Sequence, residues 1–368
     1  MNDPSRGHAP RLTILFSGMI AADPWQGGAT WAVLQYVLGL SRLGHDVYLI
    51  EPVPAGPRRT SLQESDSATY FRQVVRRFAL EGRAALLAAG GTETVGLTYD
   101  ELRAAARRAD LLINVSGMLA DEALLAPVPR RVYLDLDPAF VQLWHAQGIN
   151  MRFAAHTHFV TVGQNLGREE CPVPTCGIDW IATAQPVVLS HWPAAPISAI
   201  AHQGLTTVAN WRGYGSVEYE GTFYGQKAHS WRPLAALPTR TSERFMPALS
   251  IHPGEAADLA LLAANGWTLL DPARVAATPD EYQQFVRESK AELAVAKAGY
   301  VVSRCGWFSD RSACYLASGR PVIAHETVFT RWLPPGEGVF AFSTAEQALC
   351  AIEAMNRDYA RHARAARA

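Results

Sequence analysis

The sequence lacks both a strong net charge and a long apolar run. Its 368 residues contain 33 Lys and Arg against 34 Asp and Glu, so the formal net charge is −1. A nucleic-acid-binding protein usually carries a basic stripe, so this balance predicts no nucleic-acid partner. No stretch approaches the roughly 20 apolar residues that a membrane helix needs. We therefore expect a protein without a membrane span.

Cysteines are few and scattered. The five are Cys171, Cys176, Cys305, Cys314 and Cys350. An odd, dispersed set does not fit the even-numbered framework of a disulfide-stabilised domain. Cys171 and Cys176 are close in sequence, but no second Cys or His pair at zinc spacing accompanies them. We expect reduced thiols in a cytoplasmic protein and no structural metal.

Two common nucleotide-binding fingerprints are also absent. No G-x-G-x-x-G follows an expected strand, and no Gly-rich loop ends in the Lys-Ser/Thr pair of a P-loop. The first absence argues against a dinucleotide-binding site, and the second against a P-loop nucleotidase.

The sequence does contain a regular alternation of strands and helices. Residues 11–16 predict a strand, residues 30–43 an amphipathic helix that Gly44 closes, and residues 46–51 a second strand. Strand, helix and strand within about 40 residues form a βαβ unit, whose crossover is nearly always right-handed. This pattern predicts an α/β fold.

The alternation continues in two series. The first has expected strands at 110–115, 131–136 and 157–163, with helical patterns at 67–88 and 99–109. A stretch rich in Pro and Trp, residues 171–196, marks the expected linker. The second has expected strands at 205–210, 248–252, 267–270, 300–303 and 321–324, and helical patterns at 255–264, 279–297 and 309–318. We expect an N-terminal domain over 1–185, a C-terminal domain over 186–345 and a terminal helix over 346–368.

The most informative segment is 300–324. An expected strand ends at residue 303, a tight turn contains Gly306, and a helix opens with Ser309 and Asp310 as capping candidates. Such a turn presents backbone N–H groups and the positive end of a helix together, which suits a diphosphate. The helix end is worth about 0.3–2 kcal/mol towards a negative charge.

This segment resembles the donor-binding box of UDP-dependent glycosyltransferases with the GT-B fold. Residues 304–309 read Arg-Cys-Gly-Trp-Phe-Ser and residues 319–321 read Gly-Arg-Pro, where the family has His-Cys-Gly-Trp-Asn-Ser and later Gly-Val-Pro. The resemblance implies two Rossmann-like domains facing across a cleft, with the donor diphosphate on the C-terminal one. It also implies donor contacts from Gly306, Trp307, Ser309 and Asp310. Arg304 and Phe308 depart from the family pattern, and Arg304 can still bind a phosphate.

Four further residues are donor-side candidates. GT-B enzymes commonly set a basic side chain after the first strand of the donor domain, which suggests Lys227 with Arg212 behind it. A solvated loop lysine is the alternative interpretation of Lys227. Trp267 lies where the donor base usually docks, and Glu326 follows the last strand, where it can reach sugar hydroxyls.

The acceptor side is expected after the first strand. Gly27 and Gly28, with Trp25 before them, match the Gly-rich acceptor loop of many GT-B enzymes. A glycine pair in a βα loop also serves turn geometry alone, which is the simpler alternative.

Transfer with inversion needs a base near the acceptor hydroxyl. We consider Asp23 first, then His156, then Asp137, although an Asp before Pro24 is often a turn residue. Asp135 and Asp137 form the only Asp-x-Asp pair considered for a metal, and they fall in the half of the chain that does not hold the donor.

These observations predict a metal-independent glycosyltransferase. The donor would be a UDP- or dTDP-sugar, the acceptor a small molecule or peptide, and the protein a monomer or homodimer without another cofactor. Retaining GT-B enzymes often carry two glutamates eight positions apart where this chain has Gly306 and Cys314, which favours inversion. A sugar-nucleotide epimerase and a non-catalytic nucleotide-sugar-binding protein are the alternatives, as is a Rossmann-like domain with no ligand.

Overall fold

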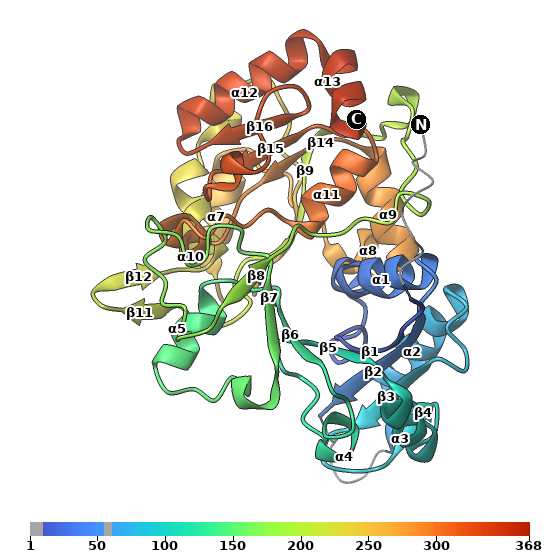
Figure 1. The fold of residues 1–368 in the computed structure, drawn as a ribbon. Coiled ribbons are helices and arrows are strands. Elements are labelled where there is room, and N and C mark those ends of the chain that lie inside the picture. Colours follow the sequence, from blue (N-terminus) through green and yellow to red (C-terminus); the bar gives the residue numbers. More distant parts are fainter. Residues whose placement is uncertain (1–9, 55–60) are drawn as a thin grey trace. The chain divides into compact units, whose positions relative to one another are not determined.

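The structure is a computed structural model that describes residues 10–54 and 61–368. The chain separates into two compact units (Figure 1). The first comprises the chain up to Pro24, Val33–Leu134 and Arg152–His158, and the second comprises Trp25–Ala32, Asp135–Met151 and Phe159–Ala368. The limits expected from the sequence, 1–185 and 186–345, stay a prediction.

The first unit is built on a mostly parallel sheet. Its strands lie in the order β4-β3-β2-β1-β5-β6. Their bounds are β1 Thr13–Ser17, β2 Asp46–Val53, β3 Ala84–Ala88, β4 Thr94–Gly96, β5 Leu111–Val115 and β6 Arg131–Asp135. The helices around it are α1 Gly27–Arg42, α2 Asp66–Arg77, α3 Tyr99–Arg108 and α4 Glu122–Leu125. The strand order reverses direction between β1 and β5, which is where doubly wound sheets bind ligands.

The second unit repeats this arrangement. Four parallel strands lie in the order β16-β15-β14-β9, and β10 pairs with β13. Because only Thr207 separates β9 from β10, the order continues through β10 to β13 and then to Leu270, which bridges Ala248. The bounds are β9 His202–Thr206, β10 Val208–Asn210, β13 Ala248–Ser250, β14 Ser289–Ala294, β15 Val322–His325 and β16 Val339–Phe342. The strand order reverses between β9/β10 and β14.

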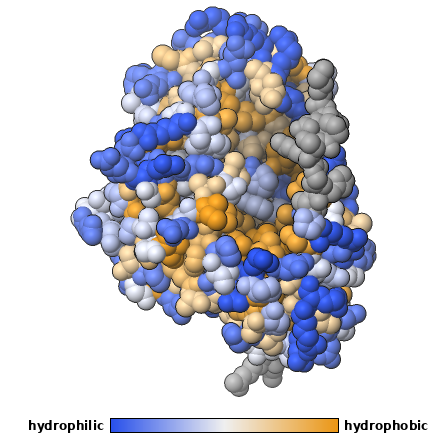
Figure 2. Space-filling model, viewed as in Figure 1, coloured by the Kyte–Doolittle hydropathy of each residue, from blue (hydrophilic) through white to orange (hydrophobic). Residues whose placement is uncertain are grey.

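The remaining elements of the second unit surround this sheet. Antiparallel strands β11 and β12 form a hairpin, and β7 pairs with β8. The bounds are β7 His158–Thr161, β8 Trp180–Ala182, β11 Val217–Tyr219, β12 Thr222–Tyr224, α5 Phe140–Ala146, α6 Lys227–Trp231, α7 Ala256–Ala264, α8 Pro272–Val275, α9 Pro279–Glu288, α10 Ala298–Ser303, α11 Asp310–Ala317, α12 Ala345–Arg357 and α13 Tyr359–Arg367. The hydrophilic outer faces of α12 and α13 are the blue patches at the top of Figure 2.

Two element predictions were wrong. Residues 300–303, expected as a strand, belong to α10, and the expected helix over 279–297 is α9 followed by β14. A short apolar run does not distinguish a strand from a buried helix, because both bury every side chain. In β14 the charged Lys290 and Glu292 interrupt the apolar pattern, although Glu292 is fully buried. The expected helix over 67–88 likewise ends at Arg77, and β3 follows.

The expected opening βαβ unit is confirmed. Strand β1, helix α1 and strand β2 fall where the periodicity and Gly44 predicted them. None of the helices formed by residues 10–54 and 61–368 is long and apolar enough to cross a membrane.

Candidate functional site

The point where the strand order of the second unit reverses gathers several charged side chains. Strand β10 ends at Asn210 and β14 ends at Ala294. Lys227 begins helix α6, Lys297 caps α10, and Arg311 lies in the first turn of α11. Ligands of doubly wound sheets bind outside the carboxyl ends of the strands at this position, so we examined each contact there.

The turn between α10 and α11 is closely packed. Gly306 has φ +76°, and a side chain on it would meet the Asn165 backbone nitrogen at 2.7 Å. Its N–H donates to the Thr327 carbonyl at 2.7 Å, and its carbonyl accepts from Trp332 Nε1 at 3.0 Å. The expectation that the Gly306 N–H is open to a phosphate therefore needs correction, because that donor is already used.

The start of α11 provides the open donors. Ser309 is the N-cap, and its hydroxyl accepts from the Arg311 N–H at 3.2 Å. Within the described part of the chain, the N–H groups of Asp310 and Ser312 meet no acceptor. The buried Ser312 hydroxyl has no partner there either. Unpaired N–H groups in the first helical turn, together with the helix dipole, favour an anion.

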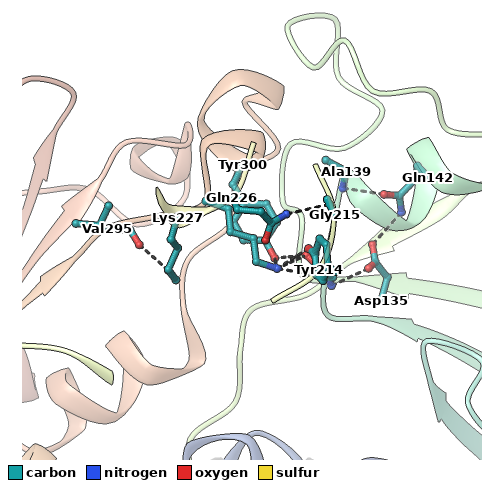
Figure 3. Close-up of polar contacts among 11 residues, drawn as sticks. Asp135, Ala139, Gln142, Tyr214, Gly215, Gln226, Lys227, Val295 and Tyr300 are labelled. Carbon is teal, nitrogen blue, oxygen red and sulfur yellow. Dashed lines mark hydrogen bonds and ion pairs between the residues drawn. The ribbon is translucent and has the colours of Figure 1, made fainter. Parts of the chain in front are cut away.

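Lys227 is buried without a counter-ion. Its amine donates to the Val295 carbonyl at 2.6 Å (Figure 3) and lies 5.8 Å from the centre of the Trp307 ring. No carboxylate of the described residues lies within ion-pair distance of this amine. Burial, and then the positive charge of Arg311, hold the pKa of Lys227 well below its ordinary value.

A buried ion pair anchors the start of α11. Arg311 Nε donates to Glu292 Oε1, and Arg311 Nη1 donates to the Val208 carbonyl at 3.0 Å. Thr207 adds a hydrogen bond to the same Glu292 oxygen at 3.1 Å. These bonds connect α11 to both strands that border the reversal point, so they fix the direction in which the helix start points.

Asp137 belongs to a second buried cluster. Lys297 Nζ lies 3.1 Å from both of its carboxylate oxygens, and the hydroxyls of Tyr214 and Tyr300 donate to it. The same amine lies 4.1 Å from the centre of the Tyr214 ring, which adds a cation–π contact. The Asp137 carboxylate is therefore fully engaged in the structure.

The neighbouring Asp135 faces a different set of partners. It is fully buried and accepts from Gln142 Nε2 and the Thr161 hydroxyl, each at 2.8 Å (Figure 3). Burial raises the pKa of Asp135 to about 6. Across residues 10–54 and 61–368 no group of three His, Cys, Asp or Glu side chains is placed to hold a metal ion.

The other donor-side candidates do not join this site in the structure. Arg304 is exposed after the end of α10, and Arg212 forms an ion pair with Glu255. Trp267 is a core residue whose indole N–H donates to the Ala235 carbonyl at 2.7 Å. Glu326 accepts from the Val328 N–H.

The Gly27-Gly28 pair allows a close approach of helices. A side chain on Gly27 would meet the Thr278 carbonyl at 2.2 Å, and one on Gly28 would meet the Tyr282 ring at 2.9 Å. The Gly27 N–H donates to the Ala276 carbonyl at 2.9 Å. The glycines thus have a packing role, while Trp25 just before them is 36% exposed.

His156 lies in the first unit with both ring nitrogens occupied. Nδ1 lies 2.9 Å from the Arg152 carbonyl and Nε2 lies 3.0 Å from Asn114 Nδ2. These contacts fit a neutral ring that donates from Nδ1 and accepts at Nε2, and burial lowers the pKa of His156. The ring nitrogens are therefore committed to structural hydrogen bonds.

Asp23 is exposed at the end of a loop that Glu51 holds. The buried Glu51 carboxylate accepts from the backbone N–H groups of Ile20, Ala21 and Ala22 at 2.6–3.0 Å. Burial raises the pKa of Glu51 to about 7. One side chain at the end of β2 thus orders the segment that leads from β1 to Asp23.

Sequence reasoning missed Glu292, Arg311, Lys297, Tyr214 and Tyr300. The one available signal was the pair of charged residues inside 289–294, since a charge in a buried strand usually has a specific partner. That signal was lost because the segment was assigned to a helix. The two tyrosines gave no local signal.

The comparisons with known proteins bear on the fold. No family model matches the chain, and no curated protein matches it in sequence. Among solved structures, an α-glucosyltransferase in complex with UDP and a 13-mer DNA containing a central A:G mismatch aligns with a TM-score of 0.57 and 12% identity, over 95% of this chain and 92% of that chain.

Two other solved structures align similarly. HepE of Anabaena in complex with UDP and glucose has a TM-score of 0.56 and 12% identity, over 97% of this chain and 93% of that chain. AviGT4, a glycosyltransferase involved in avilamycin A biosynthesis, has a TM-score of 0.51 and 12% identity, over 96% of this chain and 92% of that chain. The chain therefore has the GT-B fold that the donor box predicted.

Proposed function

We propose that the protein is a metal-independent glycosyltransferase that uses a UDP- or dTDP-sugar. The observation that carries the proposal is the start of α11, where the N–H groups of Asp310 and Ser312 and the Ser312 hydroxyl are unpaired at the reversal point of the sheet. Lys227 from α6 supplies the cationic group beside them. The named complexes of two GT-B neighbours contain UDP, which supports a uridine nucleotide here.

In this proposal the second unit holds the donor. The helix start, the Ser312 hydroxyl and Lys227 stabilise the diphosphate as the bond to the anomeric carbon breaks, so no metal ion is needed. Asp23 accepts the proton of the acceptor hydroxyl, whose oxygen bonds to the anomeric carbon. We propose inversion because Gly306 and Cys314 offer no carboxylate for a double displacement. The acceptor is a small molecule or peptide, and no nucleic-acid partner is proposed.

A thermal-shift panel with UDP, dTDP, GDP and ADP, each with EDTA or with Mg²⁺, tests the donor. We expect UDP or dTDP to raise the melting temperature in EDTA, and a ligand at 100 times its Kd stabilises by about 2.7 kcal/mol. A shift that requires the metal, or no shift with either nucleotide, contradicts the proposal.

Turnover then separates the reaction classes. A transferase consumes the sugar nucleotide only when an acceptor is present, and Asp23→Asn should lower the rate about 10²-fold or more. Consumption without any acceptor indicates the epimerase alternative. Binding without turnover across an acceptor panel indicates a non-catalytic binding protein.

A further inference from the structure

The buried amine of Lys227 is the most unusual charged group at the donor site. Its one printed hydrogen bond goes to a backbone carbonyl, Val295 O, and a neutral amine makes that bond as well as an ammonium does. A buried ammonium normally has a carboxylate in contact. Lys290, Lys297 and Arg311 each have such a partner in this structure, and Lys227 does not.

The groups that surround this amine leave it uncompensated. Arg311 of α11 and Lys297 before α10 disfavour a further positive charge, and each is already paired, with Glu292 and Asp137 respectively. Glu292 of β14 and Asp310 of α11 favour the charge from a distance. His325 at the end of β15 is neutral, because burial lowers its pKa to about 4.

We propose that Lys227 is neutral in the empty protein and takes up a proton from solvent when the donor diphosphate binds, so that donor binding is linked to pH. The inference rests on the proposed function, because it assumes that the diphosphate occupies the start of α11. An anion placed beside the amine supplies the counter-charge that the protein itself withholds. Diphosphate and proton therefore bind together, and each strengthens the binding of the other.

The consequence is a loss of donor affinity at alkaline pH. Above the pKa of the empty-state amine, each added pH unit weakens donor binding up to about tenfold, because one proton must be taken up from a more dilute supply. The diphosphate of UDP-glucose is esterified at both ends, so it has no group that titrates near neutral pH. It is therefore a clean probe of protons gained by the protein.

The test is isothermal titration calorimetry of the full chain with UDP-glucose at about pH 8, in buffers that differ in ionisation enthalpy. We expect the wild-type protein to take up close to one proton per molecule bound. Lys227→Arg keeps a cation whose charge does not titrate in this range, so it should bind UDP-glucose without proton uptake. Lys227→Met should bind more weakly and also without uptake.

Further outcomes separate this inference from the proposed function. If wild type binds UDP-glucose with no proton uptake between pH 7 and 9, the linkage is wrong while the donor site stands. If uptake persists in Lys227→Arg, another group takes the proton and the assignment to Lys227 is wrong; a control His325→Asn variant should retain the wild-type uptake. If UDP-glucose, UDP and dTDP all fail to bind a folded wild-type protein, both the inference and the proposed function fail.

Discussion

At the scale of single residues, the contact between Glu292 and Arg311 is the most sensitive point of the donor site. Glu292→Gln leaves the Arg311 guanidinium buried without its counter-charge. Breaking a buried pair from one side costs about 3–5 kcal/mol, so urea denaturation should show a loss of that order. UDP affinity should fall too, since Arg311 positions the start of α11.

The control for this variant is Glu255→Gln. Glu255 forms an ion pair with Arg212, which is more exposed than Arg311. Such pairs contribute about 0–1 kcal/mol. A cost for Glu292→Gln no larger than that of the control would contradict the assigned role.

Glu51 predicts a specific dependence of stability on pH. Its pKa is raised from 4.5 to about 7 in the folded protein, so the folded state holds its proton more tightly than the unfolded chain does. The stabilisation is complete below about pH 4.5 and is lost as pH rises through 7. The shift corresponds to about 3 kcal/mol.

The measurement is the free energy of unfolding of wild type and Glu51→Gln between pH 4 and pH 8. The variant should be less stable at every pH, since an amide oxygen cannot replace two carboxylate oxygens that receive three N–H groups. The wild-type advantage should nevertheless shrink as pH rises. An advantage that grows with pH would show that the carboxylate is stabilised in its ionised form.

At the scale of elements, sequence patterns located α11 but not the strand that supports it. Ser309, Gly306 and Gly319 are local signals, because caps and positive φ angles depend on residues near in sequence. The identity of β14 depends on burial between β9 and β15, which no local period encodes. The same limit applies to the site, since Lys297 and Asp137 are 160 positions apart.

The first turn of α11 allows a prediction in which stability and binding change differently. Ser312→Ala removes a buried hydroxyl that has no partner among the described residues, so the free energy of unfolding should stay the same or rise. If that hydroxyl donates to the diphosphate, UDP affinity should fall about tenfold, since a hydrogen bond to a charged group contributes about 1.5–3 kcal/mol.

The same helix provides a matched control. Ser318, just beyond the end of α11, is also buried, and its hydroxyl is likewise unpartnered in the described structure. Ser318→Ala should have a similarly small effect on stability and none on the Kd for UDP. Equal Kd values for wild type and Ser312→Ala would remove the hydroxyl from the donor site.

At the scale of the whole molecule, the chain contains two doubly wound sheets and therefore two points where the strand order reverses. In the first unit this point lies between β1 and β5, followed by residues 18–22 and 116–118. In the second it lies between β9/β10 and β14, followed by residues 225–228 and 295–313. The open helix start and the uncompensated lysine occur at the second point, which is why we assign the nucleotide there.

Hydrogen–deuterium exchange with and without saturating UDP distinguishes the two points. We expect slower exchange in peptides covering 225–228 and 295–313, because bound phosphate accepts from N–H groups of α11 that otherwise face solvent. Peptides covering 18–22 should change little, since Glu51 already holds those N–H groups. Protection confined to 18–22 and 116–118 would instead assign the nucleotide to the first unit. It would also remove the reason for placing the diphosphate beside Lys227, since the helix start there would then have another role.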